Sequence, residues 1–411
     1  MKNFFLLFIF FLLWYISPIP QFYDLTSSFF AATIAILLLF YFKTIAIDRT
    51  LYVTKRYFNF NILLFILMSV HTIIAFLMFS KGINTGKYLA SVFVLFIFLY
   101  SAYLFGHKLE ESDQSFLNKM LKMFFILMLL IGSFSLTKII TSSQHAKPVF
   151  PYTEPSHYAL FFVSLLYYTA IKAGKWRILV IFSGLLIALI VENLTLLVAV
   201  SILSLSVFRW RALFILPIVV LFVLNNFDLD YFSSRLNFTE DVNNLSTLVY
   251  IQGWELMRQS LEMSNGLGLG FQQLGEIPMK RTPAGEIIYM ITKDDYNLKD
   301  GGFTLAKLVS EFGIAGIILS FLYLILFVKC FNKLGSKKLL QEDNVYIYAI
   351  AVITAYFSEF LVRGVGYFNP TTFMFFVALF IYFRYSKRKK EENDEPDETD
   401  EPEHEYSVSK T

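Results

Sequence analysis

Residues 355–370 read AYFSEFLVRGVGYFNP, and this stretch decides the fold because charges interrupt a long apolar run. An Arg at the centre of a membrane-spanning helix costs roughly 2.5–3.5 kcal/mol on insertion scales. The presence of Glu359 and Arg363 in this segment therefore requires an interaction that offsets the cost. Either the two side chains, four residues apart on one helix, neutralise each other, or Arg363 points into a cavity and binds an anionic group.

The composition predicts that lipid is the solvent for most of the chain. Of 411 residues, 56% are hydrophobic and only 16% are charged, which is more apolar than a soluble protein of this size needs to be. Residues 387–411 hold five basic and ten acidic residues, so the net charge of +3 combines a tail of −5 with a remainder of +8. This acidic tail is disordered by composition. The single cysteine, Cys330, excludes an internal disulfide and a cysteine-based metal site.

Apolar segments recur along the chain. A helix needs about 20 residues to cross a hydrocarbon core about 30 Å thick. We count twelve, at residues 3–16, 27–42, 60–79, 87–106, 119–140, 157–172, 177–191, 193–208, 211–226, 303–328, 345–365 and 370–384. Lys and Arg gather in alternate loops, after the second, sixth, eighth, tenth and twelfth segments. This alternation predicts that both termini are cytoplasmic. The first segment lacks a small-x-small cleavage site, so we interpret it as an uncleaved anchor.

Residues 178–208 are predicted to form two short helices, because one long helix would put Arg209 and Arg211 on the wrong side. Each half spans only about 22 Å at 1.5 Å per residue. Their turn, VENL, would lie below the outer membrane surface, with Glu192 in a depression.

Residues 227–302 are predicted to form one large extracytoplasmic loop, too long for a simple connection and typical of a lid or binding loop. Within it, NNLSTLVYIQGWELMRQSLEM has apolar residues at helical spacing, with Ser246 as a possible N-cap, and SNGLGLGFQQLG ends the helix. The fold class is thus an all-α polytopic membrane protein with about twelve spans and a partly helical loop. Spans one to nine occupy residues 1–226, spans ten to twelve 303–386, and the tail 387–411.

Arg363 lies about 27 Å along a span that begins near Val345, at the level of the outer headgroups. A guanidinium fork suits phosphate oxygens, and Gly364 and Gly366 would let a ligand approach the backbone closely. Glu311 and Lys307 are also four residues apart, so mutual neutralisation is the simpler interpretation for them.

Three further groups are candidates for acid–base chemistry. Glu192 has no cation within four residues of it in the sequence. Glu154 and His157 flank the start of a helix at Pro155 and Ser156, where free backbone N–H groups favour anions; a solvated helix start is the alternative. Arg235, Arg258 and Arg281 are each typical of surface charges, but together could form a phosphate-attracting rim. GLGLG lacks the strand–turn–helix setting of a dinucleotide site, and no His or Cys supports a metal site, so we expect neither metal nor cofactor.

The architecture resembles that of the O-antigen polymerase (Wzy-type) and O-antigen ligase group of membrane glycosyltransferases. EPSHYALFF, GWELM with GLGLGFQQLG, GGFTLAKLVSEFGIAGII and EFLVRGVGYF are similar to segments of the polymerases. The resemblance implies a GT-C-like fold, a bacterial inner-membrane location and substrates linked to undecaprenyl pyrophosphate. It also implies a chain-length regulator as partner, and no nucleic acid. Ligases of this group use a His in the large loop, but residues 227–302 contain none, which disfavours the ligase.

On this resemblance, the protein transfers a growing glycan from its lipid carrier onto the next lipid-linked repeat unit. Arg363 would hold the departing pyrophosphate, with Arg235, Arg258 or Arg281 as a second clamp and Glu359 and Tyr367 in the same substrate site. The acceptor hydroxyl needs a base, for which Glu192 is the first choice, followed by Glu154 and His157. The alternative is a lipid-linked oligosaccharide flippase. Transporters usually show two related halves, and the large loop has no counterpart in the first half.

Overall fold

A computed structural model describes residues 2–23, 25, 29–47, 54–79, 82–142, 149–211, 244–295 and 297–394. Within these ranges the chain is helical and contains no strand, only one isolated bridge between Val149 and Tyr152. The longer helices are α1 (Lys2–Phe11), α3 (Phe30–Phe42), α4 (Lys55–Met78), α5 (Thr85–Glu110), α6 (Gln114–Ser142), α7 (Pro155–Lys172), α8 (Arg177–Ile190), α9 (Leu194–Phe208), α12 (Leu245–Met263), α13 (Pro283–Thr292), α14 (Thr304–Leu334), α15 (Asn344–Ala355) and α17 (Pro370–Asp394). Shorter ones are α2 (Ile19–Phe22), α16 (Phe357–Leu361) and the turns Leu12–Ile16, Lys43–Ile47, Gly174–Trp176, Arg209–Arg211 and Lys337–Gln341.

In the part of the chain that the structure describes, six helical stretches are long and apolar enough to cross a membrane, judged by length and composition. They are Asn3–Phe22, Tyr57–Met78, Thr85–Glu110, Gln114–Phe134, Thr304–Leu334 and Asn344–Leu361, and Phe30–Ile45 and Leu194–Phe208 are shorter apolar helices. Helices also occupy the predicted segments at 157–172, 177–191 and 370–384. The ninth predicted segment lies outside the described residues from 212 onward, as do Arg235 and most of the acidic tail. The all-helical class is therefore confirmed, while the count of twelve spans stays a prediction.

Polar contacts join helix ends that lie far apart in the sequence. Asn344 bonds to Gln114 at the start of α6, and Arg384 of α17 pairs with Glu110 at the end of α5. The Tyr103 hydroxyl, near the end of α5, reaches Thr54 at the start of α4. The cytoplasmic placement of both termini stays a prediction.

The pair of short helices predicted for residues 178–208 is confirmed. Helix α8 ends at Ile190, α9 begins at Leu194, and the two helices pack against each other and against α7. Glu192 lies in the turn between them, as the positions of Arg209 and Arg211 led us to expect.

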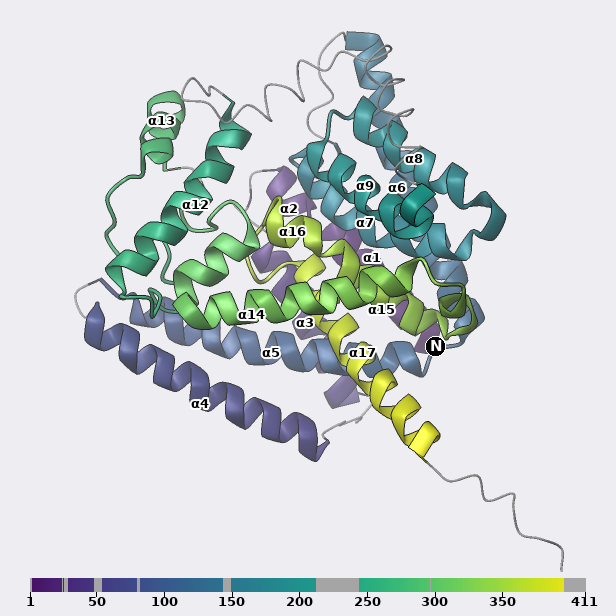
Figure 1. The fold of residues 1–411 in the computed structure, drawn as a ribbon, viewed down its shortest axis with the longest axis horizontal. Helices are drawn as coiled ribbons and strands as arrows, with labels where there is room; N and C mark the ends of the chain where they lie inside the picture. Colours follow the sequence, from purple (N-terminus) through teal and green to yellow (C-terminus); the bar gives the residue numbers. More distant parts are fainter. Residues whose placement is uncertain are drawn as a thin grey trace, which may run out of the picture.

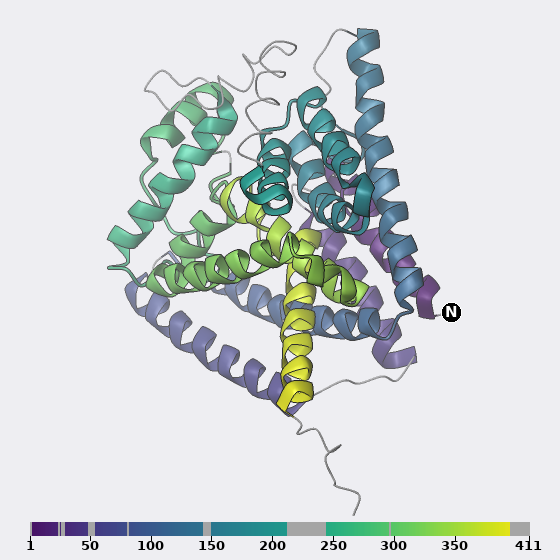
Figure 2. The same cartoon turned by 45° about the vertical axis from the view of Figure 1, so that its right-hand side comes forward.

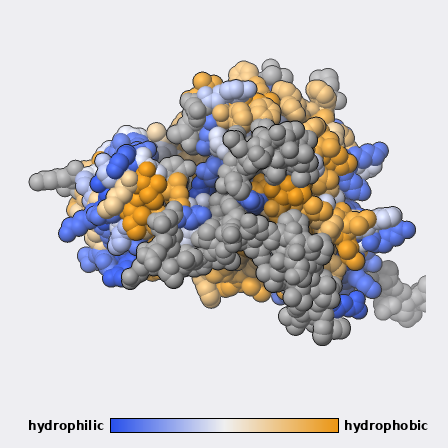
Figure 3. Space-filling model, turned by 90° about the horizontal axis from the view of Figure 1, so that it is seen from above, coloured by the Kyte–Doolittle hydropathy of each residue, from blue (hydrophilic) through white to orange (hydrophobic). Residues whose placement is uncertain are grey.

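The described part of the large loop forms α12 and α13, which stand together on one side of the molecule, away from α6 (Figures 1 and 2). The predicted helix is confirmed, although its N-cap is Asn244 rather than Ser246; the Asn244 side chain accepts from the Ser246 N–H. Seen from above, this part is mostly hydrophilic, whereas the helices beside it present broad hydrophobic surfaces (Figure 3). This distribution of hydrophilic and hydrophobic surface is the one expected if the loop faces water and the helices face lipid.

The glycine-rich segment after α12 inserts into a break in α14. At Gly313 the φ of α14 is 58°, and the Ile314 N–H bonds to the Gly266 carbonyl instead of one within its own helix. In return, the N–H of Leu269 bonds to the Ser310 carbonyl at 3.0 Å. The loop thus supplies the hydrogen bonds that the interrupted helix cannot make itself. A Cβ at Gly268 would clash with the Glu311 carbonyl oxygen, which explains a glycine there.

A second attachment fixes the loop to the start of α5. Glu276 accepts hydrogen bonds from Lys87 at 2.9 Å and from Lys299 at 3.0 Å, and the Gln273 side chain accepts from the Asn84 N–H. Burial alone would raise the pKa of Glu276, but the hydrogen bonds from the two lysines outweigh it and bring this pKa to about 2.

We predict that Gly268→Ala lowers the melting temperature of the purified protein in detergent. The position has a φ of +86°, for which a non-glycine residue costs about 1–3 kcal/mol, and the clash with Glu311 adds to this. Gly86→Ala is the control, because a Cβ there meets only the Asn84 side chain, at 3.7 Å. Equal stability of the two variants would contradict the insertion of the loop into α14.

We also predict that Glu276→Gln destabilises the protein at pH 7 but progressively less in acid. A carboxylate with a lowered pKa stabilises the fold above its unfolded value of 4.5, and this contribution disappears as the pH falls toward 2. Melting curves of wild type and variant between pH 7 and pH 3 should therefore converge. A difference that stays constant over this range would argue against the charged attachment.

Candidate functional site

The span predicted at residues 345–365 is broken. Helix α15 ends at Ala355, the short α16 ends at Leu361, and residues 362–369 are not helical before α17 begins at Pro370. Arg363 therefore lies just beyond the end of a helix instead of inside one. Its position near the end of the span was predicted correctly, but the continuous helix was not.

A hydrogen-bonded cluster around Glu359 holds the non-helical segment in place. This side chain is 1% exposed, and one carboxylate oxygen accepts from Asn369 at 2.7 Å and from Thr372 at 3.1 Å. The other accepts from the Thr371 hydroxyl. Glu359 thus joins α16 to the start of α17 and lines only a separate cavity of about 20 Å³. Its placement in the substrate site is not supported by this geometry.

Gly364 of the motif admits protein backbone instead of a ligand. The Gly364 N–H bonds to the Gly302 carbonyl at 2.9 Å, and a Cβ at Gly364 would lie 2.7 Å from the Thr304 nitrogen. At Gly366 the nearest atom to a Cβ would be a side-chain carboxylate oxygen of Asp300, at 3.2 Å. The interpretation that Gly364 makes room for substrate is corrected accordingly, and for Gly366 it stays a prediction.

Beside Arg363 lies a cavity of about 340 Å³, within the size range of small-molecule sites. Its lining comes from five parts of the chain: Thr153, Glu154, Pro155 and Ser156; Glu192, Asn193, Leu194 and Thr195; Leu245, Ser246, Thr247, Val249 and Tyr250; Gly302; and Leu361, Val362 and Arg363. Three of these parts are helix N-termini, those of α7, α9 and α12. Each carries about half a positive charge, which favours negative charge in the cavity, where Glu154 and Glu192 place two carboxylates.

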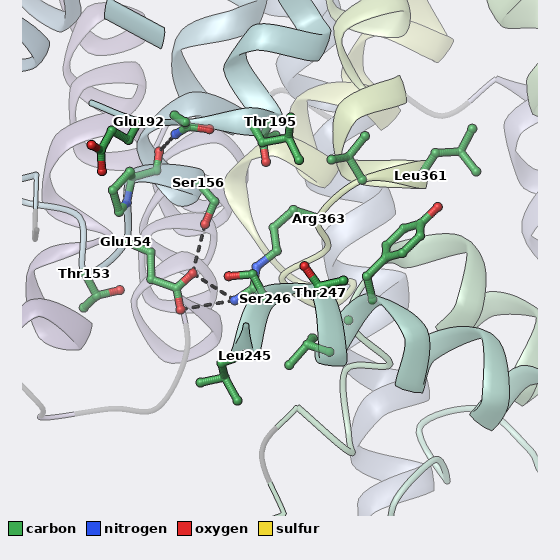
Figure 4. A pocket seen from close by; sticks show the side chains of 17 residues that line it. Thr153, Glu154, Ser156, Glu192, Thr195, Leu245, Ser246, Thr247, Leu361 and Arg363 are labelled. Atoms are coloured by element: carbon green, nitrogen blue, oxygen red, sulfur yellow. Dashed lines mark hydrogen bonds and ion pairs between the residues drawn. The ribbon is translucent and has the colours of Figure 1, made fainter. Parts of the chain in front are cut away.

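Arg363 pairs with Glu154 across this cavity wall (Figure 4). One terminal nitrogen of the guanidinium donates to both carboxylate oxygens of Glu154, at 2.9 and 3.1 Å. The Ser156 hydroxyl donates to the same carboxylate at 2.9 Å. The hypothesis that Glu359 neutralises Arg363 on one helix is therefore wrong. The partner lies 209 residues away in sequence and belongs to the predicted site.

Glu192 lines the same cavity from the α8–α9 turn. Its φ of 50° is unusual for a residue with a side chain. In Figure 4 its carboxylate lies apart from the Glu154–Arg363 pair. Glu192 thus lines a cavity, while its depth below the membrane surface and its role as base stay predictions.

His157 lies behind the cavity wall. Its side chain is 5% exposed, its Nδ1 is 3.1 Å from the Thr153 hydroxyl, and its ring meets the Phe29 ring edge-on. It does not line the cavity, although Thr153 does. A direct role as base would need the wall to open.

Among the described residues, the other predicted substrate residues, Arg258, Arg281 and Tyr367, do not line the cavity. Arg258 is exposed and pairs with Glu262, and Arg281 pairs with Asp295 and covers the Tyr289 ring. Tyr367 stacks on Phe271 with ring centroids 5.7 Å apart. A function of the two arginines at the rim stays a prediction.

Lys307 and Glu311 neutralise each other, as their spacing predicts. Their charged atoms lie 3.2 Å apart, and both side chains are at most 2% exposed. This pair is part of the packing between α14 and the loop.

Sequence reasoning missed several polar residues of the cavity. Asn193 caps α9 by accepting from the Leu196 N–H, and its amide donates to the Pro155 carbonyl, which joins the starts of α9 and α7. Thr195, Ser246 and Thr247 follow the caps of α9 and α12. The capping asparagines were the available signal, because each marks a helix N-terminus.

No family model, curated protein or solved structure matches the chain. The function is therefore inferred from the motifs of the sequence and from the geometry of this cavity.

We predict that Glu359→Gln destabilises the protein by about 1–3 kcal/mol, because one of the two carboxylate oxygens that accept hydrogen bonds in this buried cluster becomes an amide N–H₂, which accepts none. Thermal unfolding in detergent measures the change. Glu262→Gln, in the exposed pair with Arg258, should change stability by less than about 0.5 kcal/mol. Equal effects of the two substitutions would mean that the Glu359 cluster does not hold the segment.

Proposed function

We propose that the protein is a membrane glycosyltransferase that polymerises glycan repeat units linked to undecaprenyl pyrophosphate. The growing glycan is transferred onto the next lipid-linked repeat, as in O-antigen polymerases, whose motifs the sequence resembles. The observation that carries the proposal is the convergence of Arg363 and three helix N-termini on one cavity. Such a cavity suits the pyrophosphate that the reaction releases.

The charges of the cavity favour a polyanion. Arg363 contributes one positive charge and the three helix N-termini about one half each, against the carboxylates of Glu154 and Glu192. A pyrophosphate would bring the negative charge that this arrangement lacks. Fixed positive groups of this kind also stabilise the charge that develops on the departing pyrophosphate, and so lower the barrier.

The reaction needs one proton to be removed. As the acceptor hydroxyl attacks the anomeric carbon, its proton passes to a carboxylate while the bond from that carbon to the pyrophosphate oxygen breaks. Glu192 and Glu154 both line the cavity, and Glu192 is the first choice because its carboxylate lies apart from Arg363 and thus from the phosphate that this arginine would hold. The energy comes from the glycosyl–pyrophosphate bond.

We predict that the purified protein in liposomes converts synthetic lipid-linked repeat units into a ladder of longer lipid-linked glycans without a nucleotide sugar. Arg363→Lys should reduce the rate at least tenfold, because Lys cannot reproduce the planar guanidinium fork. Glu192→Gln should abolish the ladder while the substrate still binds. Glu262→Gln, remote from the cavity lining, is the matched control.

Two results would contradict the proposal. Wild-type polymer length in Arg363→Lys would remove this arginine from the site. Movement of the lipid-linked unit across the liposome membrane without a ladder would favour the flippase.

A further inference from the structure

We propose that Glu154 is a displaceable counter-ion, which occupies Arg363 in the empty site and is exchanged for a phosphate group of the substrate. This inference rests on the proposed function and adds to it a control on substrate binding. Glu154 stands where an incoming phosphate would have to bind, because its two oxygens already take the donor on Arg363 that faces the cavity.

The surroundings of Glu154 fit an exchange better than a permanent structural link. Its side chain is 33% exposed, whereas that of Arg363 is 14% exposed. By contrast, the buried Lys307–Glu311 pair is at most 2% exposed at either side chain. Water and ligand can reach Glu154, so separating it from Arg363 does not leave a carboxylate buried without solvent.

Glu154 is the N-cap residue of α7, yet its side chain makes no capping hydrogen bond to that helix. It accepts hydrogen bonds from Arg363 and from the Ser156 hydroxyl. When a phosphate replaces it, Glu154 can keep the bond to Ser156, and α7 loses no cap.

The charges determine the direction of the exchange. One carboxylate brings a single negative charge to Arg363, whereas a pyrophosphate brings more and offers a guanidinium fork several oxygens. A monoanion such as chloride gains less from displacing Glu154, so the pair selects against it.

The test measures binding of inorganic pyrophosphate to the full-length protein in nanodiscs by isothermal titration calorimetry. Removing the built-in competitor should make Glu154→Gln bind up to about fivefold more tightly than wild type, the upper end of the range for an exposed ion pair. Arg363→Gln should bind weakly, and in that background Glu154→Gln should bring no gain. Glu262→Gln should bind as wild type does.

Ser156→Ala provides a second variant that keeps both charges. It removes the hydroxyl that holds Glu154 in place, and should tighten pyrophosphate binding about twofold, in line with the loss of one modest hydrogen bond. Unchanged or weaker binding in both Glu154→Gln and Ser156→Ala would overturn the inference while leaving the polymerase proposal intact. Failure of the polymerase proposal itself would instead appear as a missing glycan ladder in wild type.

Discussion

The break in the helix after Leu361 is the constraint on which the rest of the site depends. In a bilayer, backbone groups that leave a helix must find partners within the protein. Here Glu359 joins the broken segment to the start of α17, and the Gly364 N–H bonds to the Gly302 carbonyl. Because both ends of the segment are fixed, Arg363 projects toward α7 instead of following the helix axis.

Some ion pairs of the chain can be predicted from sequence spacing, and others cannot. Lys307 and Glu311 are four residues apart, so helix geometry alone predicts their contact. The same rule applied to Glu359 and Arg363 fails, because the helix ends between them. The i, i+4 rule holds only within a continuous helix. The apolar residues between Glu359 and Arg363 do not indicate that the helix ends there.

The sequence therefore predicts the scaffold well and the site only in part. The positions of Arg209 and Arg211 were enough to divide residues 178–208 into two helices, and apolar spacing located α12. Glu154, Glu192 and Arg363 were each selected for local reasons, and all three line one cavity. Their grouping could not be derived, because it depends on the packing of α7, α9, α12 and the broken segment, which no local pattern records.

The glycines show why part of the site was predicted incorrectly. Gly364 and the GLGLG segment both signal a close approach to the backbone, but a sequence does not say what approaches. In both cases it is another part of this protein: Gly302 and Thr304 beside Gly364, and the interrupted α14 beside Gly268. The same contact shapes the cavity. Gly302, at the end of the large loop, lines the cavity and accepts a hydrogen bond from the Gly364 N–H, next to Arg363. The loop and the broken segment therefore form this part of the cavity wall together, and the position of the arginine depends on both.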